Sequence, residues 1–173
     1  MVSLADWILG RRSGAGLTLP EFGTYVVAQT IGAVSGSVVA NAMFEVGTSI
    51  SAKERATTGH LLGEVIATAG LVLLIFALAA TSRGALAAPA VGAYIGAAYW
   101  FTSSTSFANP AVTVGRIFSD TFAGIAPASV PGFVVAQLVG AAVGLGLLLI
   151  LFPSAARTAD EVVLPHSSEA ANP

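Results

Sequence analysis

The segment YVVAQTIGAVSG (Tyr25–Gly36) recurs, position by position, as FVVAQLVGAAVG (Phe133–Gly144). Each copy places a glutamine, Gln29 or Gln137, inside a long apolar stretch. Internal repeats in a membrane protein are typical of pseudo-symmetric channels and transporters, in which the functional site lies where the repeats meet. The two segments are therefore predicted to be equivalent helices of two repeats.

The composition places this repeat in a lipid bilayer. Of the 173 residues, 55% are apolar and only 9% are charged, and the mean hydropathy is +0.83. That is too apolar for an ordinary soluble domain, so we expect a multi-pass protein of the plasma (inner) membrane. The net charge of −2 comes from scattered residues, which argues against a nucleic-acid partner. Cysteine is absent, which excludes thiolate metal sites, and we expect neither a metal nor a cofactor.

Four apolar stretches are candidates for membrane-spanning helices, which need roughly 20 residues each. They cover residues 22–44, 60–80, 86–101 and 131–152, the third being short. Thr18 and Glu21 have capping-box spacing and Pro20 lies between them, which predicts a helix start ahead of the first stretch. Pairs of glycines four residues apart predict close helix packing in all four stretches; the pairs are Gly32 and Gly36, Gly59 and Gly63, Gly92 and Gly96, and Gly140 and Gly144.

Between the last two stretches, the sequence SSTSFANPAVTVGR (Ser103–Arg116) is too polar to span a membrane and too apolar for a solvated loop. We interpret it as re-entrant. Asn109 can cap a helix that has Pro110 in its first position, and this short helix would extend to about Ser119. Its positive end and the Asn109 amide would hold the oxygen of a neutral molecule and repel a cation, as in a pore for water or small solutes.

The motif Asn109-Pro110-Ala111, together with Glu64, Gln29 and Gln137 in their helices, resembles the aquaporins, or major intrinsic proteins. The resemblance covers nearly all of residues 1–152 and is closest to a bacterial subgroup, some members of which are associated with arsenic handling. It implies an all-α membrane protein, an aquaporin-like helical bundle with inverted repeats. Here four spanning helices and two re-entrant half-helices are expected, and a homotetramer when the protein is complete.

The resemblance also implies roles for individual residues. Asn109 would donate to the permeating molecule, while Glu64, a carboxylate inside an apolar span, would brace backbone groups of the re-entrant loop. Gln29 and Gln137 would be buried polar braces.

The selectivity filter departs from the family pattern. Val112 stands where water-selective and glycerol-conducting relatives carry arginine, Ala97 stands where water-selective ones carry histidine, and Ser106 takes the third position. A filter of these residues should be wider and less polar than that of a strict water channel. Arg116 follows Val112 by one helical turn. It either supplies part of the missing charge at the pore mouth or is an interfacial arginine.

Repeat correspondence also divides the chain. Val2-Ser3-Leu4 matches Val112-Thr113-Val114, so a half-helix is expected over residues 2–10, with its Asn-Pro and two spans preceding Met1. Residues 1–44 would be the remnant of the first repeat, 45–59 an extracellular loop, 60–152 the complete second repeat and 153–173 a disordered cytoplasmic tail.

The positive residues give a weak topology signal. The cytoplasmic side would carry Arg11, Arg12, Arg83 and Arg157, and the outer side would carry Lys53, Arg55 and Arg116.

The sequence thus predicts a passive channel for water and small neutral solutes, such as glycerol-like polyols or arsenous acid, incomplete as given. Two alternatives stay open: a non-conducting truncated paralogue or remnant, and half of a secondary transporter, for which Glu64 is the only deep ionisable candidate. We expect no enzyme, because His60 and His166 lack an acid, base or metal constellation. The physiological solute stays open.

Overall fold

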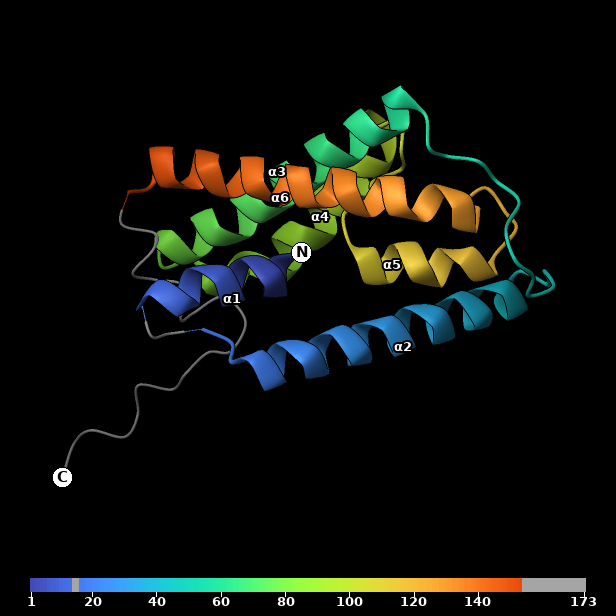
Figure 1. Ribbon diagram of the computed structural model, residues 1–173, viewed down its shortest axis with the longest axis horizontal. Helices are drawn as coiled ribbons and strands as arrows, with labels where there is room; N and C mark the ends of the chain where they lie inside the picture. The colour runs from blue at the N-terminus through green and yellow to red at the C-terminus, as the bar shows by residue number, and fades with distance from the viewer. Residues whose placement is uncertain (14–15, 154–173) are drawn as a thin grey trace.

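The computed structural model describes residues 1–13 and 16–153, and within these ranges every regular element is a helix. Figure 1 shows their arrangement. In chain order they are α1 (Val2–Ser13), α2 (Leu19–Met43), α3 (Thr58–Ala80), the 3₁₀ turn η1 (Gly84–Leu86), α4 (Ala87–Phe101), α5 (Pro110–Gly115), the 3₁₀ turns η2 (Arg116–Phe118) and η3 (Pro127–Ser129), and α6 (Val130–Leu151). The all-α fold class is as predicted.

Four of these helical segments are long and apolar enough to cross a membrane. They are Leu19–Met43, Thr58–Ala80, Gly84–Phe101 and Pro127–Leu151, which match the four predicted stretches. Large apolar side chains are exposed on each of them, for example Ile31, Ile66, Trp100 and Ile150. Such surfaces need lipid or another apolar partner. The chain is therefore a multi-pass membrane protein.

Capping chemistry sets where the spans begin. The Thr18 hydroxyl accepts from the backbone N–H of Glu21, whose carboxylate accepts from the backbone N–H of Thr18, so α2 begins at Leu19, three residues before the apolar stretch. In the same way Thr57 caps α3 by accepting from the backbone N–H of His60. The connection predicted to end at residue 59 thus ends at Thr57, since helix starts follow caps rather than hydropathy.

The two short helices lie end to end along α2, with their N-terminal ends facing each other in the middle of the molecule (Figure 1). This is the arrangement of two half-helices that the repeat predicts. α1 continues to Ser13, beyond the predicted end at Gly10. α5 ends at Gly115 and tightens into η2, so it is shorter than predicted, in keeping with the 3₁₀ geometry common at helix ends.

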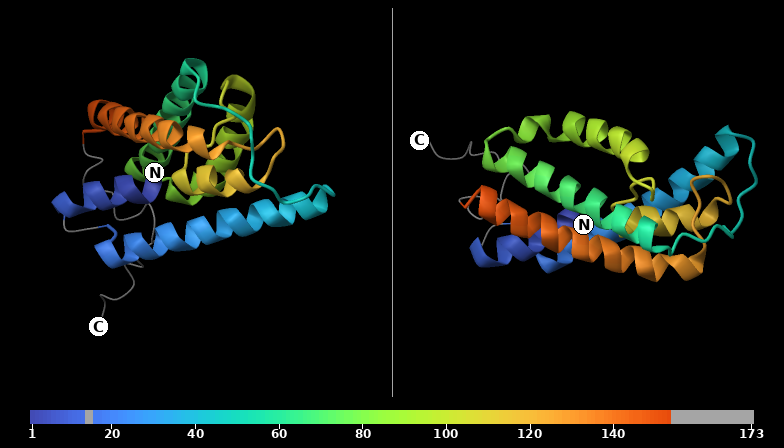
Figure 2. Two further views of the ribbon diagram at one scale, coloured as in Figure 1. Left: turned by 45° about the vertical axis from the view of Figure 1, so that its right-hand side comes forward. Right: turned by 90° about the horizontal axis from the view of Figure 1, so that it is seen from above.

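Close glycine contacts join α3 to α6. A Cβ atom on Gly140 would lie 2.5 Å from the carbonyl oxygen of Val65, and one on Gly144 would lie 2.6 Å from that of Ala69. The views in Figure 2 show α3 lying between α4 and α6. Only glycine lets two helix backbones approach this closely.

The other three glycine pairs make no close helix contact among the described residues, and Gly63 lies against Ser103 and Ser104 of the re-entrant segment. Cβ atoms on Gly32 and Gly36 of α2, or on Gly92 and Gly96 of α4, would meet nothing within 4 Å. Gly36 instead lines a cavity together with Val112 and Arg116, and no helix of the described residues lies against these glycines.

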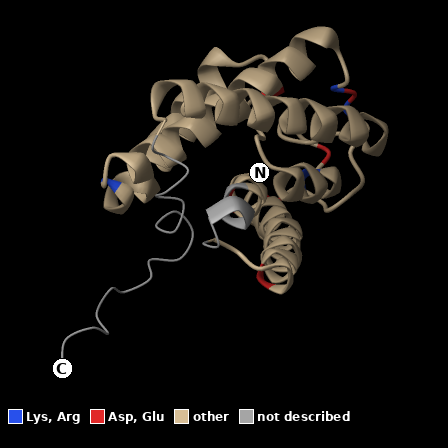
Figure 3. Cartoon of the chain, turned by 60° about the vertical axis from the view of Figure 1, so that its left-hand side comes forward, with Lys and Arg blue, Asp and Glu red and all other residues tan. Residues whose placement is uncertain are grey.

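Most charged residues lie at helix ends and in loops (Figure 3). Arg83 is exposed in the connection between α3 and α4. The opposite end carries Lys53, Arg55 and Arg116 in the loops 44–57 and 116–129, which we call the long-loop end. The side chains of Arg11 and Arg12, and the predicted tail from residue 154 with Arg157, lie outside the described residues.

Candidate pore site

The segment between α4 and α5 returns the chain to the middle of the molecule. The side-chain oxygen of Asn109 accepts from the backbone N–H of Ala111 at 3.0 Å, and Pro110 takes the first helical position, as the sequence predicts. Because proline has no amide hydrogen, the first position of this helix leaves no donor unpaired. The loop before it, residues 102–109, fixes where Asn109 lies.

This loop has an unusual backbone. Thr105, Ser106 and Ala108 have φ angles of 64°, 51° and 52°, in the left-handed region that residues with a side chain rarely adopt. Each such residue costs of order 1–3 kcal/mol and persists only where the surroundings hold it. The loop conformation therefore depends on contacts from elsewhere in the fold.

Glu64 of α3 supplies the strongest of these contacts. Its carboxylate accepts from the backbone N–H of Phe107 at 2.8 Å and from that of Ala108 at 2.9 Å, and the residue is fully buried. The loop contacts expected of this carboxylate are thus present. A buried ionised group is tolerated where hydrogen bonds to it replace those of water, and here two donors come from the re-entrant loop alone.

The two glutamines of the repeat make equivalent contacts. Gln137 of α6 donates to Glu64 at 2.7 Å and to the hydroxyl of Thr113 in α5 at 2.9 Å. Gln29 of α2 donates to the hydroxyl of Ser3 in α1 at 3.3 Å. Since Ser3 and Thr113 correspond in the repeat, each glutamine holds the hydroxyl of one short helix.

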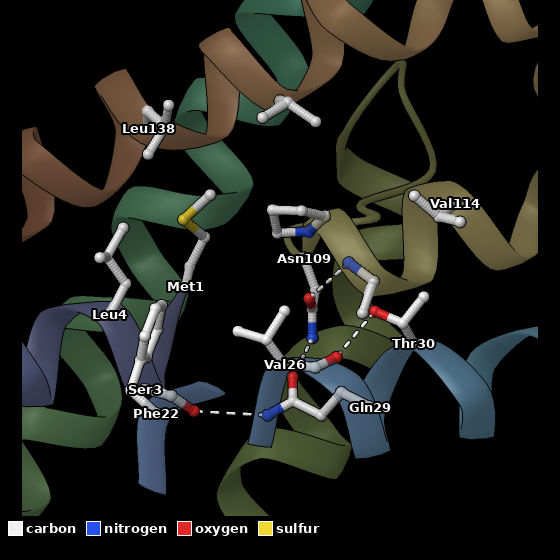
Figure 4. Close-up of a pocket in the computed structure, with 13 residues that line it drawn as sticks. Met1, Ser3, Leu4, Phe22, Val26, Gln29, Thr30, Asn109, Val114 and Leu138 are labelled. Carbon is white, nitrogen blue, oxygen red and sulfur yellow. Dashed lines mark hydrogen bonds between the residues drawn. The ribbon is translucent and has the colours of Figure 1, made fainter. Parts of the chain in front are cut away.

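Asn109 and Gln29 meet at the edge of a central cavity of about 330 Å³ (Figure 4). The side-chain amide of Asn109 donates to that of Gln29 at 3.2 Å. This amide group carries two N–H donors, and among the described residues no contact engages the second. The cavity is bounded by both short helices, at Met1, Ser3 and Leu4 of the first and at Pro110, Ala111 and Val114 of the second.

The three predicted filter residues do not line one common cavity among those of the described residues. A second cavity, of about 300 Å³, is lined by Val112, Arg116 and small residues of α2, but neither Ala97 nor Ser106 lines it. Ala97 is exposed on α4, and Ser106 is buried in the re-entrant loop. Residues 97, 106 and 112 as a single filter therefore remain a prediction.

Arg116 is held beside this second cavity. Its guanidinium donates to the carbonyl of Ala123 at 3.2 Å and to the hydroxyl of Tyr99 at 2.9 Å, and lies 4.8 Å from the ring centroid of Phe107. It is neither fully buried nor pointing freely into lipid. The contact to Tyr99 joins α4 to the 3₁₀ turn η2, which follows α5 directly.

Sequence reasoning missed Arg55. It treats this residue as an ordinary positive charge of the outer loop, yet the side chain is 2% exposed and lies against the re-entrant loop. A single arginine between polar residues and a helix cap gives no signal of burial. Tyr99 was missed for a similar reason, since its hydroxyl meets Arg116 only after the chain has turned back on itself.

Among the described residues, no three His, Cys, Asp or Glu side chains are grouped as a metal ion would need. The imidazole of His60 lies instead 3.1 Å from the carbonyl oxygen of Arg55, at the start of α3.

The chain is similar in sequence to one curated protein whose name states a function. The chain is 45% identical over 148 residues to "Aquaglyceroporin AqpS" of Rhizobium meliloti (strain 1021). The match covers 85% of this chain and 61% of the relative, so the chain spans less than two thirds of that protein's length. No protein-family model matches the chain, and no solved structure matches it.

Proposed function

We propose that this chain, which belongs to the aquaporin, or major intrinsic protein, family, forms part of a passive channel for water and small uncharged solutes. The observation that carries the proposal is the position of Asn109. It caps α5 at the cavity where the N-terminal ends of both short helices meet, and it keeps an amide N–H for a passing molecule.

The chemistry of this cavity suits a neutral solute with oxygen atoms. Two helix N-termini direct backbone N–H groups and partial positive charge toward the same point. A hydroxyl oxygen can accept from these donors, whereas a cation is repelled by them. We infer that solutes pass the Asn109 amide as hydrogen-bond acceptors.

Solutes larger than water are favoured by the residues near α5. Val112 brings no guanidinium to the position that carries arginine in water-selective and glycerol-conducting relatives, and the named relative is an aquaglyceroporin. We propose glycerol-like polyols and arsenous acid as solutes, because both are small, uncharged and rich in hydroxyl groups. Ala97, Ser106 and Val112 are the proposed filter.

We propose that the channel lies in the plasma (inner) membrane, with the long-loop end facing outward. Residues 1–44 would belong to the first repeat and residues 60–152 to the second. A homotetramer is proposed for the complete protein. The open glycine face of α4 supports a further helix partner, from the rest of the protein or from a neighbouring subunit.

The alternative of a secondary transporter has less support. Such a transporter needs an ionisable group that can exchange a proton or an ion in mid-membrane. Glu64 is the candidate, and its two oxygens already accept from Phe107, Ala108 and Gln137. A carboxylate whose oxygens already accept these hydrogen bonds holds the loop in place and is not available to bind an ion.

The test is solute uptake by vesicles that contain the purified protein. We expect stopped-flow light scattering to show glycerol and arsenous acid entering faster than into protein-free vesicles, without a sodium or proton gradient. The longest product of the gene that contains these 173 residues should be used, with the 173-residue chain measured beside it. Uptake equal to that of empty vesicles, or uptake that requires an ion gradient, would contradict the channel.

A further inference from the structure

The long-loop end contains a buried guanidinium that the channel proposal has not used. Arg55, in the loop between α2 and α3, donates from Nε to the carbonyl of Gly124 at 2.6 Å, and from its terminal nitrogens to the carbonyls of Ser104 and Phe122. Ser104 belongs to the re-entrant loop, and the other two residues belong to the loop that follows α5. Arg55 thus joins both loops that flank the short helix.

Within the described part of the chain, Arg55 forms no ion pair, and its donors meet carbonyl oxygens only. Burial lowers the pKa of Arg55 below its ordinary value, and the positive charge of Arg116 lowers it further, while Glu64 acts in the opposite direction. An arginine keeps its proton under such shifts, so the positive charge is permanent.

A second guanidinium lies close to the first. The guanidinium carbons of Arg55 and Arg116 are 5.2 Å and 4.8 Å from the centroid of the Phe107 ring, two residues before Asn109. Arg116 also lines the second cavity beside Val112. Two positive charges therefore pack against the re-entrant loop that leads to Asn109, and one of them also lines the cavity beside position 112.

We propose that Arg55, acting with Arg116, determines charge selectivity by supplying the cation barrier at the outer mouth that an arginine at position 112 would otherwise supply. This inference rests on the proposed channel function. Neutral donors could have satisfied the three carbonyl groups that Arg55 contacts. Burying an arginine without a carboxylate costs free energy, which favours a role for the charge itself. A buried charge is also poorly screened by salt, so this barrier operates at high ionic strength.

The test measures sodium leak and glycerol uptake in vesicles that contain the protein or its variants. Arg55→Gln should raise the sodium leak about tenfold, because one unscreened charge in a medium of low dielectric changes a barrier by about a decade in rate. Glycerol uptake should stay within about twofold of native. Arg55→Lys, which keeps the charge but not the three-way contact, should leak much less than Arg55→Gln.

The matched control is Lys53→Gln. Lys53 lies in the same loop with the same charge, but contacts the ring of Phe122 at 4.8 Å rather than the carbonyls of the loops flanking α5. Its loss should leave the sodium leak near native. A leak as large as that of Arg55→Gln would make the effect one of net charge and overturn the assignment.

A second variant keeps the proposal testable if Arg55→Gln does not fold. Arg116→Gln removes the second charge on the Phe107 ring and leaves Arg55 in place. We expect it to raise the sodium leak relative to Lys53→Gln. Native protein without glycerol uptake would contradict the channel itself, whereas native uptake with no extra leak in Arg55→Gln or Arg116→Gln would overturn this inference alone.

Discussion

Replacing Glu64 with alanine is expected to abolish solute uptake and to lower the free energy of unfolding by about 3 kcal/mol or more. The change leaves the buried N–H groups of Phe107 and Ala108 without acceptors. Hydrogen bonds to a charged group contribute about 1.5–3 kcal/mol each, and the loop they hold already contains three left-handed residues. Without these hydrogen bonds to Glu64, the loop is not held in the conformation that places Asn109 at the cavity.

Two further variants separate this effect from a general loss of charge. Glu64→Gln keeps one oxygen acceptor but turns an amide donor toward a backbone N–H, so an intermediate loss is expected. Glu54→Gln alters an exposed carboxylate that accepts a hydrogen bond from the hydroxyl of Ser129. This variant should have the stability and the solute uptake of the native protein. Thermal unfolding in detergent and glycerol uptake in vesicles measure both quantities. Native melting and uptake in Glu64→Ala would remove Glu64 from the account of the loop.

Placing arginine at position 112 is expected to lower glycerol and arsenous acid uptake more than it lowers water flow. Val112 lines the second cavity next to Arg116, so a guanidinium there adds both bulk and positive charge to this cavity. Water needs less width than a polyol and should still pass. Stopped-flow measurement of the three fluxes in one vesicle preparation gives the comparison directly.

The control for this variant is Val112→Leu, which adds bulk without charge. It should reduce polyol uptake less than Val112→Arg and leave the rejection of cations unchanged. If native and Val112→Arg protein take up glycerol equally, position 112 does not line the constriction, and the filter of Ala97, Ser106 and Val112 has to be withdrawn.

The spans and the two short helices were open to prediction because local chemistry specifies them. Apolar length identifies a span, Thr18 and Glu21 specify a helix start, and Asn109 with Pro110 specifies another. The contacts of Glu64 were also open to prediction, since a carboxylate in an apolar span needs donors and the nearby re-entrant loop has free backbone N–H groups.

Other features depend on the fold as a whole and leave no local trace. The left-handed residues of the re-entrant loop include Thr105, a β-branched residue that usually avoids this conformation, so no glycine marks the turn. The burial of Arg55 requires three carbonyls from two distant loops. Glycine spacing alone also does not identify which helices pack closely. The pairs that begin at Gly32 and Gly92 have the same spacing as the pair that begins at Gly140, yet they touch no helix among the described residues.

The central claim is that solutes pass beside the N-terminal part of α5, and a thiol placed there tests it most directly. The 173 residues contain no cysteine, so Val112→Cys introduces a single reactive group into them. Val135→Cys, on the outer face of α6 and 59% exposed, is the matched control. A methanethiosulfonate reagent should block glycerol uptake through Val112→Cys, and excess glycerol should slow the reaction, while Val135→Cys and native protein keep their flux. Complete labelling of Val112→Cys with unchanged glycerol uptake would contradict the account.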